Sequence, residues 1–400
     1  MDLKLIVKNI ENEVYSYYKY FHENPELSMK EFNTSLFVEN ILLKDSFCDQ
    51  IIKIGKTGLL AVMKGEKLEA PQENSCILLR ADMDALPITE DSKHFPCSKN
   101  SGIMHACGHD AHTAILLGVI SVLNNYKKLF SGTIYFFFQP GEETLEGAKL
   151  LFSSDEVPLD NIDGVLALHV INELYGGDIG IKSGVNLAST DSFDIEIIGR
   201  GGHGAHSYTA IDPIVIGASI ITQLQYLVSR EVRAVDSAVV SVCSIHSAGD
   251  AYNIIPERIY LKGTIRTLEK EIRIKLQKRI TELCNGVTKA FGASCNVLFK
   301  EGPPPLYNDK IWVERTKNVM SQILGKEHVK DLTVPAMGSE DFSYIKDKYP
   351  GVFVRIGCRS EGEEFTPSHN SKFVVDQKAL TTGILTFSGV VLDFLGIFNN

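Results

Sequence analysis

Three almost unbroken apolar runs constrain the possible folds of this chain more than any other feature of its sequence. They cover residues 77–80, 133–138 and 165–168, and segments with a helical spacing of apolar residues, 113–126 and 147–152, lie between them. Runs of this kind are typical of strands that are buried on both faces of a parallel sheet. The sequence therefore predicts an α/β fold in which helices cover a sheet.

Acidic or histidine side chains stand directly after each of these runs. Asp82 and Asp84 follow the first run, Glu142 and Glu143 follow the second, and His169 follows the third. Open α/β sheets place their functional sites outside the carboxyl ends of the strands. We therefore expect these side chains to lie close together at one edge of the sheet.

A nine-residue segment, Met104–His112, carries a thiol, three imidazoles and a carboxylate. Its Cys107 and His109 form a Cys-x-His pair that suits a metal ion, and the glycine between them allows a close approach of the backbone. His105 and His112 flank the pair, and capping or packing explains them as well as a supporting role beside a metal does. The segment alone offers too few ligands, so others must come from elsewhere in the chain.

Together with His369, the residues named above are enough for a pair of metal ions. One bridging ligand and two further ligands per ion would hold two divalent cations about 3.5 to 4 Å apart and lower the pKa of a water between them. Glu142 and Glu143 follow a Pro-Gly break, and neighbouring side chains of an extended loop point to opposite sides. One can therefore bind metal while the other takes a proton from the water. The pattern favours a hydrolase.

The pattern of apolar residues changes near Ser189. From there it predicts the element order β-α-β-β-α-β, over residues 194–198, 211–229, 238–246, 258–266, 269–291 and 294–299. This is the order of a ferredoxin-like split βαβ module. Because 400 residues exceed what one core usually holds, we expect a smaller inserted domain over residues 188–300. Residues 1–187 and 301–400 are expected to form a larger catalytic domain.

Charge and cysteine content exclude several classes of protein. The formal net charge of −10 comes without any basic cluster, so neither nucleic acid nor an anionic membrane is an expected partner. The apolar run at residues 5–7 is too short for a signal peptide or a membrane span, and the eight cysteines are scattered without a CxxC pair. We expect a cytoplasmic protein with reduced cysteines.

Seven motifs resemble, in the right order, those of the amidohydrolase branch of the M20 metallopeptidases, which includes hippurate hydrolases, N-acyl-amino-acid deacetylases and plant auxin-conjugate hydrolases. They are HENPEL (22–27), RADMDALP (80–87), MHACGHDAH (104–112), FQPGEE (138–143), GGHGA (201–205), GSEDF (338–342) and SHN (368–370). The resemblance spans nearly the whole chain. It implies a two-domain enzyme, with a two-metal α/β catalytic domain and an inserted ferredoxin-like α+β domain for lid and dimerisation functions.

The resemblance also implies roles for the candidate ligands. Cys107 matches a ligand that bridges two metal ions, His109 and Glu143 stand on one side, and His169 and His369 complete the set. Each subunit would hold two divalent ions. Zinc, manganese, cobalt and nickel all suit thiolate, imidazole and carboxylate ligands, so the sequence leaves the metal open.

In the lid, the resemblance assigns residues that act on the substrate. His203 matches a histidine that reaches into the partner subunit's active site and stabilises the developing oxyanion. Asn253 and Arg266 match residues that hold the free carboxylate of the substrate, a task that suits the fork of a guanidinium. We therefore expect a homodimer, or a tetramer, formed through the lid.

Glu142 matches the general base of the family and Asp84 a carboxylate that orients a metal ligand, whereas Asp82 is expected to be structural. The expected reaction is hydrolysis of the amide bond of an N-acyl amino acid or a related small conjugate by a metal-activated water. Two alternatives stay open: a thiol amidase with Cys107 as nucleophile, and an inactive relative that binds a metabolite. A chelator would stop the metalloenzyme and leave the thiol enzyme active.

Overall fold

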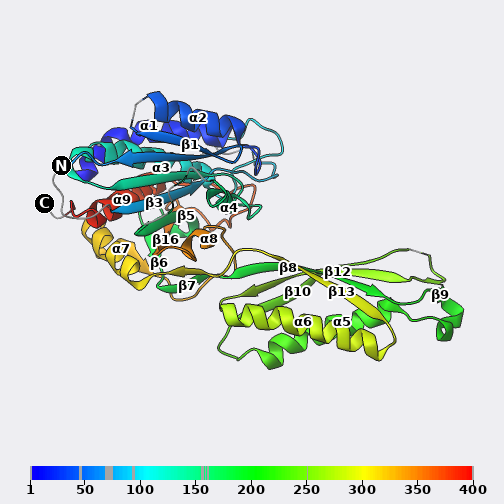
Figure 1. Ribbon diagram of the computed structural model, residues 1–400. Helices are drawn as coiled ribbons and strands as arrows, with labels where there is room; N and C mark the ends of the chain where they lie inside the picture. The colour runs from blue at the N-terminus through cyan, green and yellow to red at the C-terminus, as the bar shows by residue number, and fades with distance from the viewer. Residues whose placement is uncertain are drawn as a thin grey trace. The chain divides into compact units, whose positions relative to one another are not determined.

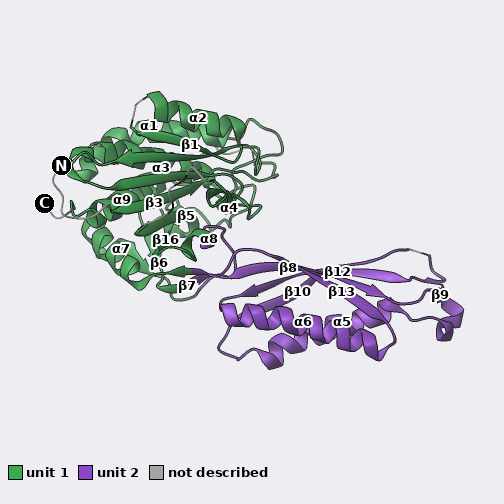
Figure 2. Cartoon of the chain, in the orientation of Figure 1, with its two compact units in different colours: residues 1–184, 307–334, 344–400 green, residues 185–306, 335–343 purple. Residues whose placement is uncertain are grey.

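The computed structural model describes residues 2–44, 47–67, 75–91, 95–154, 157, 159, 162–249 and 251–398. The chain forms two compact units (Figure 2). Unit 1 comprises residues 1–184, 307–334 and 344–400, and unit 2 comprises residues 185–306 and 335–343. Within the described ranges, no helix is long and apolar enough to cross a lipid bilayer.

Unit 1 is built on a sheet of eight strands in the order β1-β2-β4-β3-β5-β16-β6-β15 (Figure 1). The strands are β1 (Gln50–Ile54), β2 (Gly58–Lys64), β3 (Cys76–Asp82), β4 (Thr133–Gln139), β5 (Gly164–Tyr175), β6 (Ile179–Ile181), β15 (Val329–Asp331) and β16 (Gly351–Arg359). At the centre, β3 pairs in parallel with β4 and β5, and β5 with β16. The predicted α/β fold is confirmed.

One helix of unit 1, α3 (His109–Asn124), lies almost wholly inside the core and contacts α1, α9 and β3. The other helices are α1 (Leu3–Glu23), α2 (Phe32–Lys44), α4 (Gly147–Leu151), α7 (Lys310–Ile323), α8 (Ser343–Lys346) and α9 (Gln377–Phe394), with single turns η1 (Lys127–Leu129) and η4 (Lys326–His328). From Ala114 onward, α3 itself carries apolar residues on nearly every side, and a helix of that kind is buried. Its burial fixes the helix start, which carries His109.

Unit 2 has an antiparallel sheet in the order β10-β12-β8-β13, with α5 and α6 side by side on one face (Figure 1). Its main elements are β8 (Ser189–Ile198), α5 (Pro213–Tyr226), β10 (Ala238–Ser247), β12 (Arg258–Thr267), α6 (Lys270–Ala290) and β13 (Ser294–Glu301). The order confirms the predicted ferredoxin-like module. Alternate residues of β8, such as Ile195 and Ile197, enter a core shared with both helices.

Short elements complete the chain. They are β9 (Gly202–His203), η2 (Gly204–Thr209), the π-helical turn η3 (Leu227–Glu231) and β11 (Ile254–Ile255) in the lid, and β7 (Gly184–Leu187) and β14 (Leu306–Asn308), which pair with each other. In the lid, β9 pairs with β11 beyond the point where β8 and β12 stop pairing. The β9–β11 pair therefore continues the β8–β12 pair toward His203.

Candidate active site

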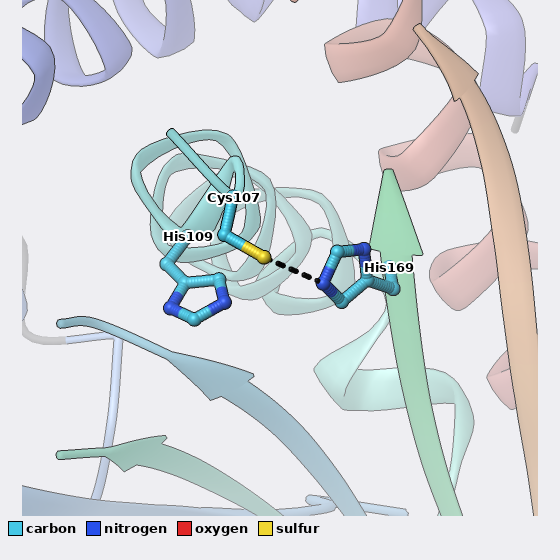
Figure 3. A group of neighbouring side chains, drawn as sticks. All are labelled: Cys107, His109 and His169. Atoms are coloured by element: carbon cyan, nitrogen blue, oxygen red, sulfur yellow. Dashed lines mark hydrogen bonds between the residues drawn. The ribbon is translucent and has the colours of Figure 1, made fainter. Parts of the chain in front are cut away.

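The turn before α3 brings Cys107 close to His169 (Figure 3). Gly108 occupies the residue before the helix with a φ of +87°, a conformation that favours glycine. A Cβ at this position would lie 2.2 Å from Cγ2 of Val170, so the close packing also requires glycine. As a result, Sγ of the buried Cys107 lies 3.4 Å from Nε2 of His169.

His109, the first residue of α3, has one ring nitrogen in hydrogen bonds with Asp84, and its other ring nitrogen lies 3.7 Å from Oδ2 of Asp82. Its Nδ1 lies 2.9 Å from the backbone oxygen of Asp84 and 3.2 Å from Oδ1 of the same residue, which assigns the ring proton to Nδ1. Its buried Nε2 has no hydrogen-bond partner in the described part of the chain. Burial alone would lower the pKa of His109, but Asp82 above all raises it well above its ordinary value. The surroundings therefore favour a cation at this ring.

His169 lies inside a strand, so the expectation that it follows the end of one is wrong: β5 continues to Tyr175. It is nevertheless level with Asp82 at the end of β3, because Arg80 pairs with Ala167 two residues earlier on each strand. Its Nδ1 donates to the backbone oxygen of Val170 at 2.7 Å, which leaves Nε2 facing Cys107. Burial lowers the pKa of His169 well below its ordinary value, so the ring is neutral, as a metal ligand must be.

A second group, Asp82, His109 and His112, also has its polar atoms within 4.8 Å of one another. In His112, however, both ring nitrogens are already used. Nδ1 lies 2.6 Å from Oδ1 of Asp82, and Nε2 accepts a hydrogen bond from the backbone N–H of Val170 at 2.9 Å. We therefore interpret His112 and Asp82 as supports that tie α3 to β3 and β5 rather than as metal ligands.

Asp84 connects the two loops that carry the candidate site. Its carboxylate accepts hydrogen bonds from the backbone N–H groups of Glu142 at 3.1 Å and Glu143 at 3.0 Å, from Ser28 Oγ at 2.6 Å, and from His109. The side chain is buried, yet the pKa of Asp84 is lowered, because these hydrogen bonds, His109 first among them, outweigh the effect of burial. One carboxylate thus fixes the positions of both loops.

Asp84→Asn is therefore expected to weaken metal binding about 10- to 100-fold without unfolding the protein, since loss of the partner that orients a metal ligand has effects of this size. The amide cannot accept from all the donors that now converge on the carboxylate. Metal affinity, measured by competition with a coloured chelator, checks the prediction, and circular dichroism controls for folding. An unchanged affinity in a folded variant would contradict it.

Two further candidate metal ligands, Glu143 and His369, contact each other. Nε2 of His369 lies 3.2 Å from Oε1 of Glu143, and the backbone N–H of His369 donates to the oxygen of Ala106 at 2.7 Å. His369 has a φ of +64°, a strained conformation for a residue with a Cβ and one that occurs preferentially at functional sites. The bond to Ala106 holds His369 against the Cys107 loop, some 260 residues earlier in the chain.

Ser28 and Glu31 were missed as supports of the site by the sequence analysis. Glu31 is fully buried and accepts from Thr57 Oγ1 at 2.7 Å and from the backbone N–H of Gly141 at 2.9 Å, which holds the loop before Glu142. The only sequence signal is their place directly after the 22–27 motif. That motif also supplies His22, whose ring nitrogens contact Asp110 at 2.6 Å and Glu90 at 2.9 Å.

The donor atoms fit metal ions. Within each of three groups the donor atoms lie within 4.8 Å of one another, and the groups are Cys107, His109 and His169; Cys107, Glu143 and His369; and His109, Glu142 and Glu143. All five ligands expected from the sequence occur in these groups, and Cys107 belongs to two of them. A buried imidazole nitrogen without a partner, surrounded by a thiol, carboxylates and further imidazoles, is the donor chemistry of a transition-metal site.

The three lid residues are not brought together in unit 2. His203 and Asn253 are exposed and line one cavity of 670 Å³, and the backbone of Asn253 bonds to Gly204. Arg266 is half-buried near the opposite end of β12, where it pairs with Thr190 at the start of β8. Twelve residues of extended chain separate Arg266 from Ile254, the partner of His203. At about 3.3 Å per residue, this is about 40 Å.

Residues 78–393 match the profile of Peptidase family M20/M25/M40. The N-acetyl-L-cysteine deacetylase of Bacillus subtilis (strain 168) is 34% identical over 94% of this chain and 86% of its own length. Thermostable carboxypeptidase 2 of Saccharolobus solfataricus is 36% identical over 98% of both chains. Among solved structures, Bacillus subtilis YxeP, a dinuclear metal-binding peptidase from the M20 family, is similar with a TM-score of 0.82 and 30% identity, over 98% of this chain and 99% of that one.

Proposed function

This chain belongs to peptidase family M20/M25/M40, and from that premise we propose that it is a metal-dependent amidohydrolase that cleaves the amide bond of N-acyl amino acids or related small conjugates. The observation that carries the proposal is the buried Nε2 of His109, which has no hydrogen-bond partner in the described chain and lies amid thiol, imidazole and carboxylate donors. The relatives named for N-acetyl-L-cysteine and for carboxypeptidase activity support a small substrate that has an amide bond and a free carboxylate.

In this proposal, Cys107, His109, Glu143, His169 and His369 hold two divalent ions, whose identity is zinc, manganese, cobalt or nickel. We assign Cys107 as the shared ligand, because it is the residue common to the group of Cys107, His109 and His169 and the group of Cys107, Glu143 and His369. The bound ions supply Lewis acidity, which polarises the carbonyl of the substrate and lowers the pKa of the attacking water. Asp84 holds His109 in the orientation that presents Nε2.

The protein's own groups then move the protons and bind the substrate. Glu142, buried after β4, accepts a proton from the attacking water and delivers it to the leaving nitrogen. His203 donates a hydrogen bond to the oxyanion, and Asn253 and Arg266 hold the carboxylate of the amino acid. Each of these steps needs only a hydrogen bond or a proton transfer at a named side chain.

The thiol amidase alternative has less support. A nucleophilic cysteine needs a lowered pKa and access to the substrate. Cys107 is only 8% exposed, and burial raises the pKa of its thiol to about 12. The inactive alternative would require lost ligands, whereas all the expected donors are in place in the described chain.

The proposal is tested by assaying metal-reconstituted protein with a panel of N-acetyl, N-benzoyl and indole-acyl amino acids. We expect release of the amino acid from at least one member, and loss of that activity after treatment with a chelator and its return when metal is added back. If folded protein with two bound ions hydrolysed no member of the panel, the proposed substrate class would be wrong.

We further propose that the enzyme works as a homodimer, or as a tetramer, joined through unit 2. The support is the separation of about 40 Å along the lid between His203 and Arg266. A single lid cannot bring both residues to one small substrate, whereas two lids related by symmetry can. The eight free cysteines support a reducing compartment, and we propose a cytoplasmic location.

Mixing two inactive variants tests whether His203 acts on the partner. His203→Ala and Glu142→Gln are each expected to be inactive, but a mixed dimer contains one site with an intact Glu142 and a His203 from the other chain. Random mixing should restore about a quarter of the wild-type rate. If His203 acted within its own chain, mixing would restore nothing, and a monomer in sedimentation experiments would also contradict the proposal.

A further inference from the structure

Arg266 makes a single side-chain hydrogen bond among the described residues of unit 2, to Ser339. Its Nη1 donates to Ser339 Oγ at 2.9 Å. Burial lowers the pKa of Arg266, but an arginine stays charged in any protein. The remaining N–H groups of this half-buried guanidinium are therefore available to a bound anion.

Ser339 is held in place by the same strand that supports Arg266. Its segment, residues 335–343, has no regular secondary structure before Ser343, but Ala188 N–H bonds to the backbone oxygens of Ala336 at 3.1 Å and Gly338 at 3.0 Å. The next residues begin β8, where Thr190 pairs with Arg266. The backbone around the start of β8 thus binds both β12 and the segment of Ser339, which gives the contact between Arg266 and Ser339 a fixed geometry.

The hydroxyl group of Ser339 can donate a hydrogen bond as well as accept one. Its oxygen accepts from Arg266, and a serine hydroxyl has one proton to donate as well. Within the described chain, that proton has no acceptor of its own. A carboxylate that binds Arg266 offers several lone pairs, so it can accept from both neighbouring groups.

We propose that Ser339 is a specificity-determining residue, which fixes the Arg266 guanidinium and adds a second donor to the site for the free carboxylate of the substrate. This inference rests on the proposed function, which assigns Arg266 to that carboxylate. Ser339 gives the enzyme part of its preference for acids over neutral amides. It takes no part in proton transfer, so it affects binding of the acid and not the chemical step.

The test compares an N-acetyl amino acid, the best of the panel, with its C-terminal amide in the metal-loaded full-length enzyme. The amide is measured as a substrate or, where turnover is too slow, as a competitive inhibitor. For Ser339→Ala, KM for the acid should rise about tenfold with little change in kcat, as expected for one hydrogen bond to a charged group. The KM or inhibition constant of the amide should not change. Ser339→Thr, which keeps the hydroxyl, should resemble the wild type.

Two companion variants distinguish the possible failures. Ser343→Ala is the matched control, because Oγ of Ser343 is buried without a hydrogen-bond partner in the described chain, and it should leave both values unchanged. Arg266→Ala should raise KM for the acid about 100-fold. If Arg266→Ala weakened binding of the acid and Ser339→Ala did not, this inference would fail and the proposed function would stand. If neither variant affected the acid selectively, this inference and the assignment of Arg266 to the substrate carboxylate would both fail.

Discussion

Replacing Glu142 with glutamine is expected to lower kcat on an N-acyl amino acid by about 10²- to 10⁴-fold while the protein keeps its metal ions. The glutamine amide has nearly the same shape but cannot accept a proton from water at neutral pH. The loop should stay in place, because the hydrogen bond that fixes it runs from the backbone N–H of Glu142 to Asp84. Release of the amino acid gives kcat, and elemental analysis gives the metal content.

The neighbouring Glu143 provides the comparison that makes this result specific. Its Oε1 lies near His369 and its donor group includes Cys107, so Glu143→Gln should lose metal as well as activity. An exposed carboxylate, Glu363, serves as the control for the loss of charge alone. If Glu142→Gln lost metal and Glu143→Gln kept it, the roles of the two residues would be exchanged. A near-normal kcat in Glu142→Gln would eliminate the general base.

Cys107→Ala is expected to have the largest effect on metal binding, because the proposed function assigns this thiol to both ions. The variant should bind metal at least 100-fold more weakly and should lose activity that excess metal restores only in part. A matched control is Cys76→Ala, since Cys76 has the same exposure of 8% and lies at the other end of β3 from the site. It should lose a little stability and no metal. Equilibrium dialysis and the same hydrolysis assay measure both effects.

The same variant separates the two enzyme classes that the sequence leaves open. In a thiol amidase, Cys107→Ala would abolish activity and leave any bound metal unchanged, and a chelator would not inhibit the wild-type protein. In the metalloenzyme, the variant and the chelator act in the same way, through loss of metal. Full metal content in an inactive Cys107→Ala protein would therefore contradict the two-metal proposal.

Much of the catalytic unit could be predicted from local patterns. The apolar runs became β3, β4 and the first half of β5, because a strand buried on both faces needs apolar residues at consecutive positions. The position of His169 could not be predicted in the same way. Its strand continues beyond its pairing with β3 and stays paired with β16, and only the register of β5 against β3 shows that His169 is level with Asp82.

The contacts that support the site through Ser28 and Glu31 could not be predicted from the sequence, for a physical reason. Ser28 lies 56 residues before its partner Asp84 and Glu31 lies 110 residues before its partner Gly141, and a buried polar residue has no periodic pattern that distinguishes it from an exposed one. His112 shows the same limit. Its sequence context allows a supporting role beside a metal as readily as capping or packing, and only the hydrogen bonds to both ring nitrogens show how it is used.

The sequence by itself determined the kinds of chemistry present: which donors the chain carries, that Asp84, Glu142 and Glu143 follow buried strands, and that a ferredoxin-like module interrupts the larger unit. These are properties of residue type and spacing, which are local. The tertiary structure alone decided which donors face one another, which histidine keeps a free nitrogen, and that His203 and Arg266 lie far apart on one lid. Those outcomes depend on strand register and on contacts between residues distant in the chain, because hydrogen bonds and metal ligation require specific distances that spacing along the sequence does not set.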